Sequence, residues 1–243
     1  SATRLENTYM TDELRLYGYW RSSAAYRVRI GLNLKGLAYE SAQVHLIRDG
    51  GEQHLPQFAQ ANPQKLIPVL QHGDRLIRQS LAIIEYIDEV WSDRQALLPA
   101  TARGRARARS LSLLVACEIH PLNNRRVLQY LEGEWRAPQS ERDEWVRHWI
   151  REGFDALEAL LADDPATGTF CEGDQPTMAD CCLIPQVYNA RRFAVDLAPY
   201  PTIRRIEAEC LALPAFDAAR PERQADAPAT CCENAPGQDR GGR

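Results

Sequence analysis

The feature that most constrains the fold is a short strand that leads through two serines into a helix. Apolar and polar residues alternate from Leu14 to Tyr19, which predicts a strand, and apolar positions recur between charged ones from Val28 to Leu34, which predicts a helix. A lysine and a glycine at positions 35 and 36 predict its end, and residues 39–46 predict a second strand. A strand, a helix and a strand in this order favour parallel pairing through a right-handed crossover.

Ser22 and Ser23 lie at the junction between the predicted strand and helix. The first turn of a helix has unpaired N–H groups and the positive end of the helix dipole, so two hydroxyls placed there would help to hold an anion. If that anion is a thiolate, the same geometry lowers its pKa and makes it reactive at neutral pH. Serine is also a common helix cap, and we expect one of the two to serve only in that way.

The composition is that of an ordinary globular protein. The chain has 243 residues, 44% of them hydrophobic and 26% charged, which suffices for one large core or two modest ones. Its formal net charge of −4 gives no reason to expect nucleic acid or an anionic membrane surface as a partner. Any anionic ligand must therefore be held by local positive charge.

The seven cysteines indicate reduced thiols rather than a disulfide framework. Their number is odd, and two pairs are adjacent in the sequence, at 181–182 and 231–232, where bridging is unfavourable. No apolar run approaches the roughly 20 residues of a membrane span, and no signal-peptide pattern opens the chain, so we expect a cytoplasmic protein. Neither a zinc-type grouping of His and Cys nor a glycine-rich phosphate loop occurs, which disfavours metal and nucleotide chemistry.

A strand start and a helix start in the first half provide further candidates for ligand binding. Pro68 holds Ile67 in an extended conformation, so the backbone N–H and C=O of Ile67 are available to an extended peptide. Residues 69–78 predict a hairpin, and the helix that follows at 81–90 has Ser80 as its predicted N-cap. The free N–H groups around Ser80 could take a carboxylate.

The second half of the chain is predicted to be helical. Helical periodicity runs from 103 to 130, where Pro121 should bend the helix, and from 140 to 161, where a stripe of Trp, Phe and Leu side chains through Leu160 is taken as core packing. Thr177 and Asp180 have the spacing of a capping box, which we expect to be structural and important for folding.

Three motifs carry a resemblance to a known family. They are Arg21-Ser22-Ser23 with the run Tyr26-Arg27-Val28-Arg29-Ile30, the segment from Asn62-Pro63 to Ile67-Pro68, and Gln79-Ser80-Leu81-Ala82-Ile83-Ile84-Glu85-Tyr86-Ile87. Together they closely resemble the zeta class of glutathione transferases, which includes the maleylacetoacetate and maleylpyruvate isomerases. The resemblance covers roughly residues 13–220, so it is far more specific than a single short motif.

The resemblance implies an α/β domain followed by an all-α domain. The first is a thioredoxin-like, glutathione-binding domain at 13–91 with a cis peptide at Ile67–Pro68, and the second is a helical-bundle, substrate-binding domain at 103–220. Residues 92–102 are the predicted linker. Residues 221–243 are expected to be a disordered tail, and the first ten or so residues are expected to be flexible.

The polar run from His120 to Arg126 is the strongest candidate site in the second half. It places His120, Asn124 and Arg126 within about two helical turns. A solvated helix face would explain the charges without a function, yet we favour a site because of this spacing. The resemblance assigns His120 and Asn124 to glutathione and Arg126 to the substrate, with Arg192 as a similar substrate contact.

The remaining glutathione contacts that the resemblance implies lie in the first domain. They are Ser22, Gln53, His54, Ile67, Gln79 and Ser80. Gln53 is the better match to the animal enzymes and His54 to the maleylpyruvate isomerases. Many zeta enzymes have a cysteine after the two serines, whereas this chain has Ala24, which excludes a protein thiol from that place.

The implied activity is the glutathione-dependent conversion of maleylacetoacetate to fumarylacetoacetate, in the breakdown of tyrosine and phenylalanine. Addition of a thiolate to one alkene carbon leaves a single bond that can rotate, and elimination then returns the trans product. The serines suit the thiolate, and arginines suit a dicarboxylate substrate and the enolate charge. The expected catalytic residues are Ser22, Ser23 and Arg21, and the expected substrate contacts are Arg21, Arg126 and Arg192.

Three alternatives stay open. Maleylpyruvate isomerase is the nearest, because the run from His120 to Arg126 resembles both enzymes. A glutathione transferase or peroxidase for apolar electrophiles predicts an apolar second pocket, and a non-catalytic interaction module predicts no glutathione binding. A homodimer is expected from the resemblance alone, and which serine activates the thiolate is left open.

Five further polar residues receive no place in the predicted site. Arg27 and Arg29 alternate with apolar residues, and we expect them to pair with carboxylates of the second domain. His45, His72 and His148 are expected to be solvated or structural.

Overall fold

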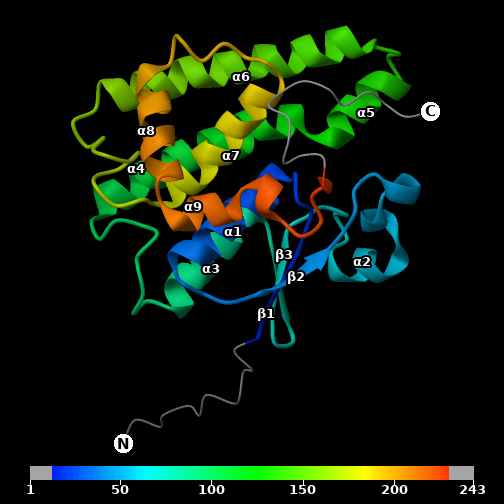
Figure 1. Ribbon diagram of the computed structural model, residues 1–243, viewed down its shortest axis with the longest axis horizontal. Helices are drawn as coiled ribbons and strands as arrows, with labels where there is room; N and C mark the ends of the chain where they lie inside the picture. Colours follow the sequence, from blue (N-terminus) through cyan, green and yellow to red (C-terminus); the bar gives the residue numbers. More distant parts are fainter. Residues whose placement is uncertain (1–12, 230–243) are drawn as a thin grey trace, which may run out of the picture.

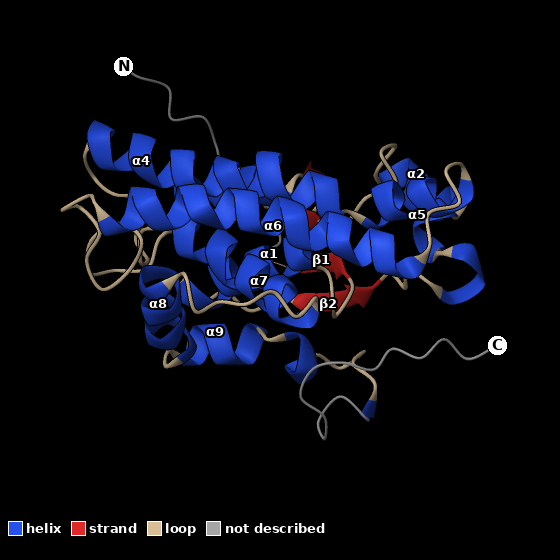
Figure 2. Ribbon diagram, turned by 90° about the horizontal axis from the view of Figure 1, so that it is seen from above, coloured by secondary structure: helices blue, strands red, loops and turns tan. Residues whose placement is uncertain are grey.

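The computed structural model describes residues 13–229, apart from the side chain of Asp49. Within these residues a four-stranded sheet with helices forms the first part of the chain and helices alone form the second, with α1 between the two (Figure 1). From above, the helices of the second part extend across the first, and the strands are only partly visible behind them (Figure 2). An α/β part is therefore followed by an all-helical part, as predicted.

The sheet is built around β1 (Leu14–Gly18), whose two leucines are buried. The strand order is β2-β1-β3-β4, with β2 parallel to β1 and the other two pairs antiparallel. The other bounds are β2 (Glu40–Gln43), β3 (Val69–His72) and β4 (Arg75–Arg78). Parallel pairing confirms the predicted strand-helix-strand unit. β2 is shorter than the predicted strand 39–46 because the His45 N–H bonds to the Glu52 carboxylate and the chain leaves the sheet.

The helix α1 (Ser23–Leu34) ends as its sequence predicts. The Lys35 N–H donates to Gly31 O, and Gly36 has a φ of +61°, which suits glycine. Because α1 packs against α3 on one side and against α7 and α9 on the other, nearly the whole of its surface is buried. The other helical elements of the first part are η1 (Arg48–Gly50), η2 (Glu52–His54), α2 (Pro56–Ala61) and α3 (Ser80–Val90).

The second part bends where the sequence predicts. Pro121 cannot donate a backbone hydrogen bond, and the chain passes there from a π-helical segment through a 3-10 turn. The elements before and after the bend are α4 (Ala102–Leu113), η3 (Leu114–Ile119), η4 (His120–Asn123) and α5 (Arg125–Gly133). They are followed by α6 (Gln139–Ala162), α7 (Met178–Arg192), α8 (Pro201–Leu211), α9 (Pro214–Ala219) and η5 (Pro221–Arg223).

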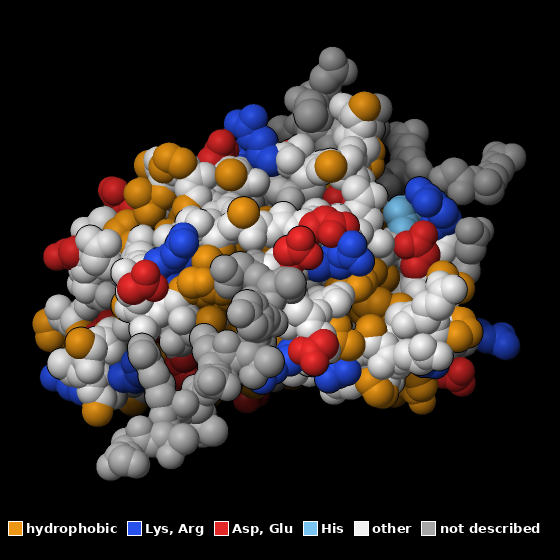
Figure 3. Space-filling view, turned by 90° about the horizontal axis from the view of Figure 1, so that it is seen from below, with side chains coloured by type: hydrophobic (Ala, Val, Ile, Leu, Met, Phe, Trp, Pro, Cys, Tyr) orange, Lys and Arg blue, Asp and Glu red, His pale blue; other side chains and the backbone are white. Residues whose placement is uncertain are grey.

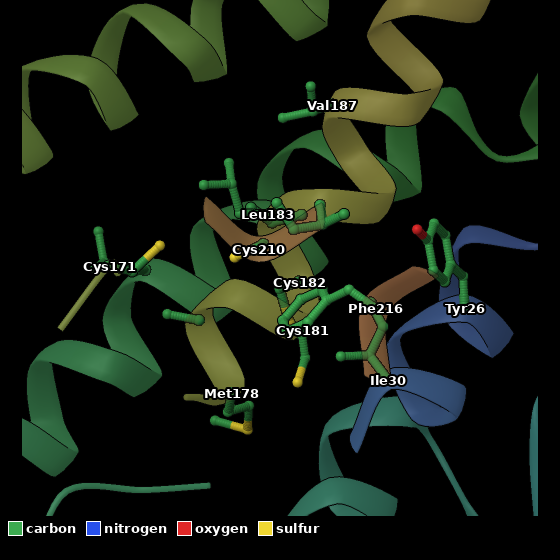
Figure 4. Close-up of a cluster of buried hydrophobic side chains, with 14 of the residues drawn as sticks. Tyr26, Ile30, Cys171, Met178, Cys181, Cys182, Leu183, Val187, Cys210 and Phe216 are labelled. Carbon is green, nitrogen blue, oxygen red and sulfur yellow. The ribbon is translucent and has the colours of Figure 1, made fainter. Parts of the chain in front are cut away.

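The two parts share one core, which is centred where α7 packs against α1. In Figure 4 the side chain of Phe216 from α9 lies near the cysteines of α7, and Tyr26 from α1 belongs to the same buried cluster. Cys181, Cys182 and Cys210 are completely buried free thiols, and burial raises the pKa of each. These thiols therefore act as small apolar side chains in the core.

Two details of the predicted packing are wrong. Leu160 is 49% exposed, because the buried stripe of α6 passes through Leu157 and Leu161 and leaves position 160 to one side. Part of the expected disordered tail is ordered, since residues 221–229 include η5 and a contact from Asp226 back to Trp20. The flexible first residues, the end of the predicted tail and the cysteines at 231–232 lie outside the described residues.

The predicted capping box at the start of α7 is confirmed and is fully buried. Asp180 accepts hydrogen bonds from the N–H groups of Thr177 at 2.7 Å and Cys171 at 2.9 Å, and Thr177 Oγ1 accepts from the Ala179 N–H at 3.2 Å. Because these donors cannot reach water, Asp180 joins the first turn of α7 to the segment that precedes it.

We expect Asp180→Ala to lower the free energy of unfolding by about 3 kcal/mol, because two buried N–H groups lose their acceptor. Asp174→Ala is the matched control: Asp174 also accepts from a backbone N–H, that of Thr169, but at an exposed position, so its loss should cost under about 1 kcal/mol. Urea unfolding of both variants measures the difference. Equal losses of unfolding free energy in the two variants would show that burial does not make the Asp180 hydrogen bonds more stabilising than exposed ones.

Candidate active site

The serine pair lies where the chain leaves β1 and enters α1. Ser22 is the N-cap of α1, with φ −68° and ψ 117°, and its Oγ accepts a hydrogen bond of 3.2 Å from the Ala25 N–H. Ser23 is the first helical residue. Since the Ser22 oxygen accepts from the helix, its own hydrogen is left to be donated elsewhere. The start of α1 thus combines a hydroxyl donor with unpaired N–H groups, an arrangement that suits an anion.

The loop before the serines is held by the far end of the described chain. The Trp20 N–H donates to Asp226 Oδ2 at 2.9 Å. The guanidinium of Arg29, which is 3% exposed, donates to Trp20 O at 3.0 Å and to Ala219 O at 2.9 Å. Burial lowers the pKa of Arg29 to about 10, so the side chain stays charged at neutral pH. Arg29 therefore bonds to main-chain carbonyls and not, as predicted, to a carboxylate.

The predicted catalytic residue Arg21 lies in the same loop. Its guanidinium carbon is 5.3 Å from the centroid of the Trp20 ring, a cation–π contact. The indole is itself 6% exposed, so the stacking surface is a rigid one. This contact holds the Arg21 side chain beside the start of α1.

The candidates Ile67, Gln79 and Ser80 lie at the ends of β3 and α3. The peptide between Ile67 and Pro68 is cis, as the resemblance implies, and the β1–β3 ladder ends at Val69, so Ile67 lies just beyond it. Gln79 has a φ of +71° and is the N-cap of α3, which makes Ser80 the first helical residue rather than the predicted cap. The left-handed backbone at Gln79 turns the chain sharply from β4 into α3.

The structure separates the two neighbouring candidates in η2. Gln53 is 7% exposed, and its Oε1 is buried without a hydrogen-bond partner among residues 13–229, whereas His54 is exposed. Gly51 has a φ of +104°, which suits glycine, and a Cβ there would lie within 2.4 Å of the Gln53 amide and displace it. A buried amide oxygen with no donor is an acceptor that a bound ligand can satisfy.

The second-domain candidates occupy the bend and the end of α7. His120 begins η4, and Asn124 is the N-cap of α5, where its side chain accepts from the Arg126 N–H at 3.1 Å. The side chains of Arg126 and Arg192 are exposed at the first turn of α5 and the last turn of α7. The Arg192 guanidinium also stacks at 4.9 Å on the ring of Phe193.

Arg27 joins two of the predicted residues across the two parts of the chain. Its Nη1 donates to Ser80 Oγ at 3.2 Å, and its Nη2 lies 2.7 Å from Nδ1 of His120. Burial, and then the charge of Arg27, lower the pKa of His120 to about 3, so the imidazole is neutral at pH 7. Arg27 therefore contacts an imidazole and a hydroxyl, not the predicted carboxylate, and it brings Ser80 and His120 together.

Sequence reasoning assigned no place in the site to Arg27 or Asp226. For Arg27 a signal existed, because it lies one helical turn after Ser23 and so shares a face with it. For Asp226 there was none, since it lies 206 residues after Trp20, the residue that it contacts. The contact depends only on how the chain folds back.

Other features of the surface do not involve the predicted site residues. A groove of about 920 Å³ lies between the end of α1, the loop before α7 and the start of α9, and none of those residues lines it. The face in Figure 3 carries acidic and basic side chains close together. Within residues 13–229 no helix is long and apolar enough to cross a membrane, and no group of three His, Cys, Asp or Glu side chains could hold a metal ion.

Comparison with known proteins supports the same assignment of fold. Residues 12–89 match the family model for the N-terminal domain of glutathione S-transferase, and residues 129–219 match a model for its C-terminal domain. The chain is 51% identical over 214 residues to a probable maleylacetoacetate isomerase of Vibrio cholerae, a match that covers 88% of this chain and 98% of that protein.

Two solved structures have a closely similar fold. The holo structure of a maleylpyruvate isomerase, a bacterial zeta-class glutathione transferase, is 49% identical with a TM-score of 0.85, over 88% of this chain and 100% of the other. The maleylacetoacetate isomerase of Methylobacterium extorquens AM1, with bound malonate and glutathione, is 45% identical with a TM-score of 0.84 and the same coverage. The chain thus belongs to the zeta class of glutathione transferases.

Proposed function

We propose that this chain is a glutathione-dependent isomerase that converts maleylacetoacetate to fumarylacetoacetate. The observation that carries the proposal is the start of α1, where the Ser22 hydroxyl accepts from the helix and keeps its hydrogen for an anion. Identity of 51% to a probable maleylacetoacetate isomerase supports the choice of substrate. Maleylpyruvate isomerase is the second candidate, supported by 49% identity to an enzyme of that kind.

The residues present fit a glutathione tripeptide. The unpaired Oε1 of Gln53 offers an acceptor for a ligand N–H, and the backbone of Ile67 lies open at the end of a strand ladder. Ser80 lies at the start of α3, where N–H groups suit a carboxylate. We assign Ser22, Gln53, Ile67, Gln79 and Ser80 to this ligand, together with His54, His120 and Asn124.

The first task of the protein is to stabilise a thiolate. When bound, glutathione supplies a thiolate that adds to one alkene carbon and leaves again after the resulting single bond has rotated. Ser22 donates its hydroxyl hydrogen to the sulfur, and the N–H groups and dipole of α1 lower the thiol pKa further. Ser23, one residue into the helix, supports the same end of α1. Ala24 has no thiol, so the chain itself supplies no sulfur at this place.

The second task is to hold a doubly charged substrate. A guanidinium binds a carboxylate in a bidentate fork and stays charged, and positive charge also stabilises the enolate that forms when the double bond is broken. We assign Arg21, Arg126 and Arg192 to this role. The net charge of the chain is −4, so these local charges and not the overall charge attract the substrate.

We also propose a cytoplasmic homodimer. The reaction does not consume glutathione but requires its thiol in the reduced form. This suits the cytosol, where glutathione is kept reduced. For the dimer, the Arg109 and Glu85 side chains join α4 to α3 at 2.7 Å, and both helices expose apolar residues, with Val90 46% and Leu113 45% exposed. A second copy of this chain packed on α3 and α4 would cover them.

We expect the purified chain to isomerise maleylacetoacetate in the presence of glutathione, with S-methylglutathione as the inactive control. Malonate should inhibit, because a small dicarboxylate competes for the arginines. Parallel assays with maleylpyruvate rank the two candidate substrates. If neither substrate is isomerised, while an apolar electrophile is conjugated without inhibition by malonate, the chain is a transferase and the proposal is wrong.

Separate Ser22→Ala and Ser23→Ala variants test the role of the N-cap hydroxyl. In Ser22→Ala we expect the pKa of the bound thiol to rise by about 1 to 2 units and kcat to fall about 10- to 100-fold, because the sulfur loses a donor. Ultraviolet titration of the bound thiolate gives the pKa. Ser23→Ala should change both quantities much less. Equal, small effects in the two variants would assign the stabilisation to the helix N–H groups instead.

The dimer is tested with light scattering on the wild type, which should show twice the mass of one chain. Leu113→Glu should produce monomers, because a charge would be buried without a partner. Leu160→Glu is the matched control, since Leu160 is similarly exposed at 49% but lies on α6. A dimer that persists in Leu113→Glu contradicts the proposed face.

A further inference from the structure

Three lysine and arginine side chains are buried in the described part of the chain, and Arg27 is the one least compensated. Lys35 has an ion pair with Asp88 at 3.0 Å, and Arg29 donates to main-chain carbonyls. Arg27 is 3% exposed and has neither a carboxylate nor a carbonyl partner within residues 13–229. Its Nε has no hydrogen-bond partner in this described part of the chain either. A buried charge in this condition is costly unless an anion approaches it.

The contacts of Arg27 determine which atoms of its two partners donate hydrogen bonds and which accept them. A guanidinium can only donate, so the Ser80 Oγ and the His120 Nδ1 must both accept from it. The hydrogen of the Ser80 hydroxyl is then directed elsewhere, and the hydrogen of the neutral imidazole lies on Nε2 of His120. Both side chains are left as donors. Ser80 also begins α3, whose first N–H groups are donors as well.

We propose that Arg27 is a positioning residue that makes Ser80 and His120 donors toward a carboxylate of glutathione, and that this carboxylate supplies the negative charge that Arg27 lacks. The inference rests on the proposed function, since it takes glutathione as the ligand. Two hydrogen-bond donors beside a buried cation favour binding of an anion. They disfavour binding of an uncharged group of the same shape. Arg27 thus acts through Ser80 and His120 rather than by direct contact.

Glutathione has two carboxylates, one on the γ-glutamyl end and one on the glycine end, and two analogues distinguish them. γ-Aminobutyryl-cysteinyl-glycine lacks the first, and γ-glutamyl-cysteinyl-ethylamide lacks the second. Calorimetric titration of the wild type should show that one of these analogues binds about 10- to 100-fold more weakly than glutathione, the range of a charge-assisted hydrogen-bond pair.

The Arg27→Met variant should bind glutathione about 10- to 100-fold more weakly than the wild type does. In this variant, the analogue that binds weakly to the wild type should bind within about 3-fold of glutathione, because the carboxylate that it lacks no longer contributes. The unliganded variant should melt at or above the wild-type temperature, because an uncompensated buried charge is replaced by an apolar side chain. If Arg27→Met does not fold, Arg27→Gln is titrated with glutathione and the same two analogues instead. A variant that discriminates the carboxylate as strongly as the wild type overturns the inference.

Arg29→Met is the matched control. Arg29 lies on the same helix two residues later and is equally buried, but its bonds go to the carbonyls of the serine loop and of Ala219. This variant should melt at a lower temperature than the wild type, yet keep the discrimination between glutathione and the analogue. If it loses the discrimination as Arg27→Met does, the effect comes from a general disturbance of α1.

The pH dependence of stability gives an independent readout of the contact with His120. The folded-state pKa of about 3 lies below the ordinary 6.5, so the unfolded chain binds this proton first and the free energy of unfolding falls as the pH drops from 6.5. Without the Arg27 charge the folded pKa lies higher, so the further fall below pH 5 should be smaller in Arg27→Met than in Arg29→Met. Equal falls in the two contradict the proposed contact.

The outcomes distinguish a failure of the proposed function from a failure of the role given to Arg27. A wild type that binds neither glutathione nor its analogues contradicts the proposed function. A wild type that binds glutathione but tolerates the loss of either carboxylate contradicts the role of Arg27 alone.

Discussion

The burial of α1 on nearly every side is the constraint on which the rest of the structure depends. The sheet part covers one side of this helix and α7 with α9 covers the other, so any polar group that α1 carries must be satisfied inside the protein. Two arginines are carried there. Arg29 is satisfied by carbonyls of the serine loop and of Ala219 at the end of α9, and Arg27 donates to Ser80 and His120, which leaves its Nε without a partner within residues 13–229. The requirement to satisfy these groups therefore couples the serine loop, the start of α3 and the bend before α5.

This coupling gives the start of α1 its chemistry. A helix N-terminus alone stabilises an anion only modestly and is open to water, which screens its dipole. Here the loop before Ser22 is fixed at Trp20 by the Asp226 carboxylate on one side and by Arg29 on the other. The Ser22 hydroxyl is fixed in turn by the Ala25 N–H. A donor whose position is set in advance stabilises a developing charge without a further cost of reorganisation.

Much of the fold followed from local sequence patterns. The end of α1 at Lys35 and Gly36, the bend at Pro121 and the capping box at Thr177 and Asp180 each depend on residues within one or two turns of each other, and each was predicted. Two predictions of element bounds failed because the periodicity does not show backbone turns and the contacts of the following loop. The strand β2 ends early because the His45 N–H donates to the Glu52 carboxylate, and Ser80 is not the N-cap of α3 because Gln79, in a left-handed conformation, takes that place.

The sequence by itself determined the order of the elements, the family, and the residue types that a thiolate and a dicarboxylate require. Periodicity, caps and turns are local properties, and a motif can be recognised in the sequence when its residues are adjacent in the chain. Only the tertiary structure decided which polar groups meet. His120 lies 93 residues after Arg27, and Asp226 lies 206 residues after Trp20. No local pattern encodes such contacts, because they arise when burial removes water and each polar group must find a partner within the fold.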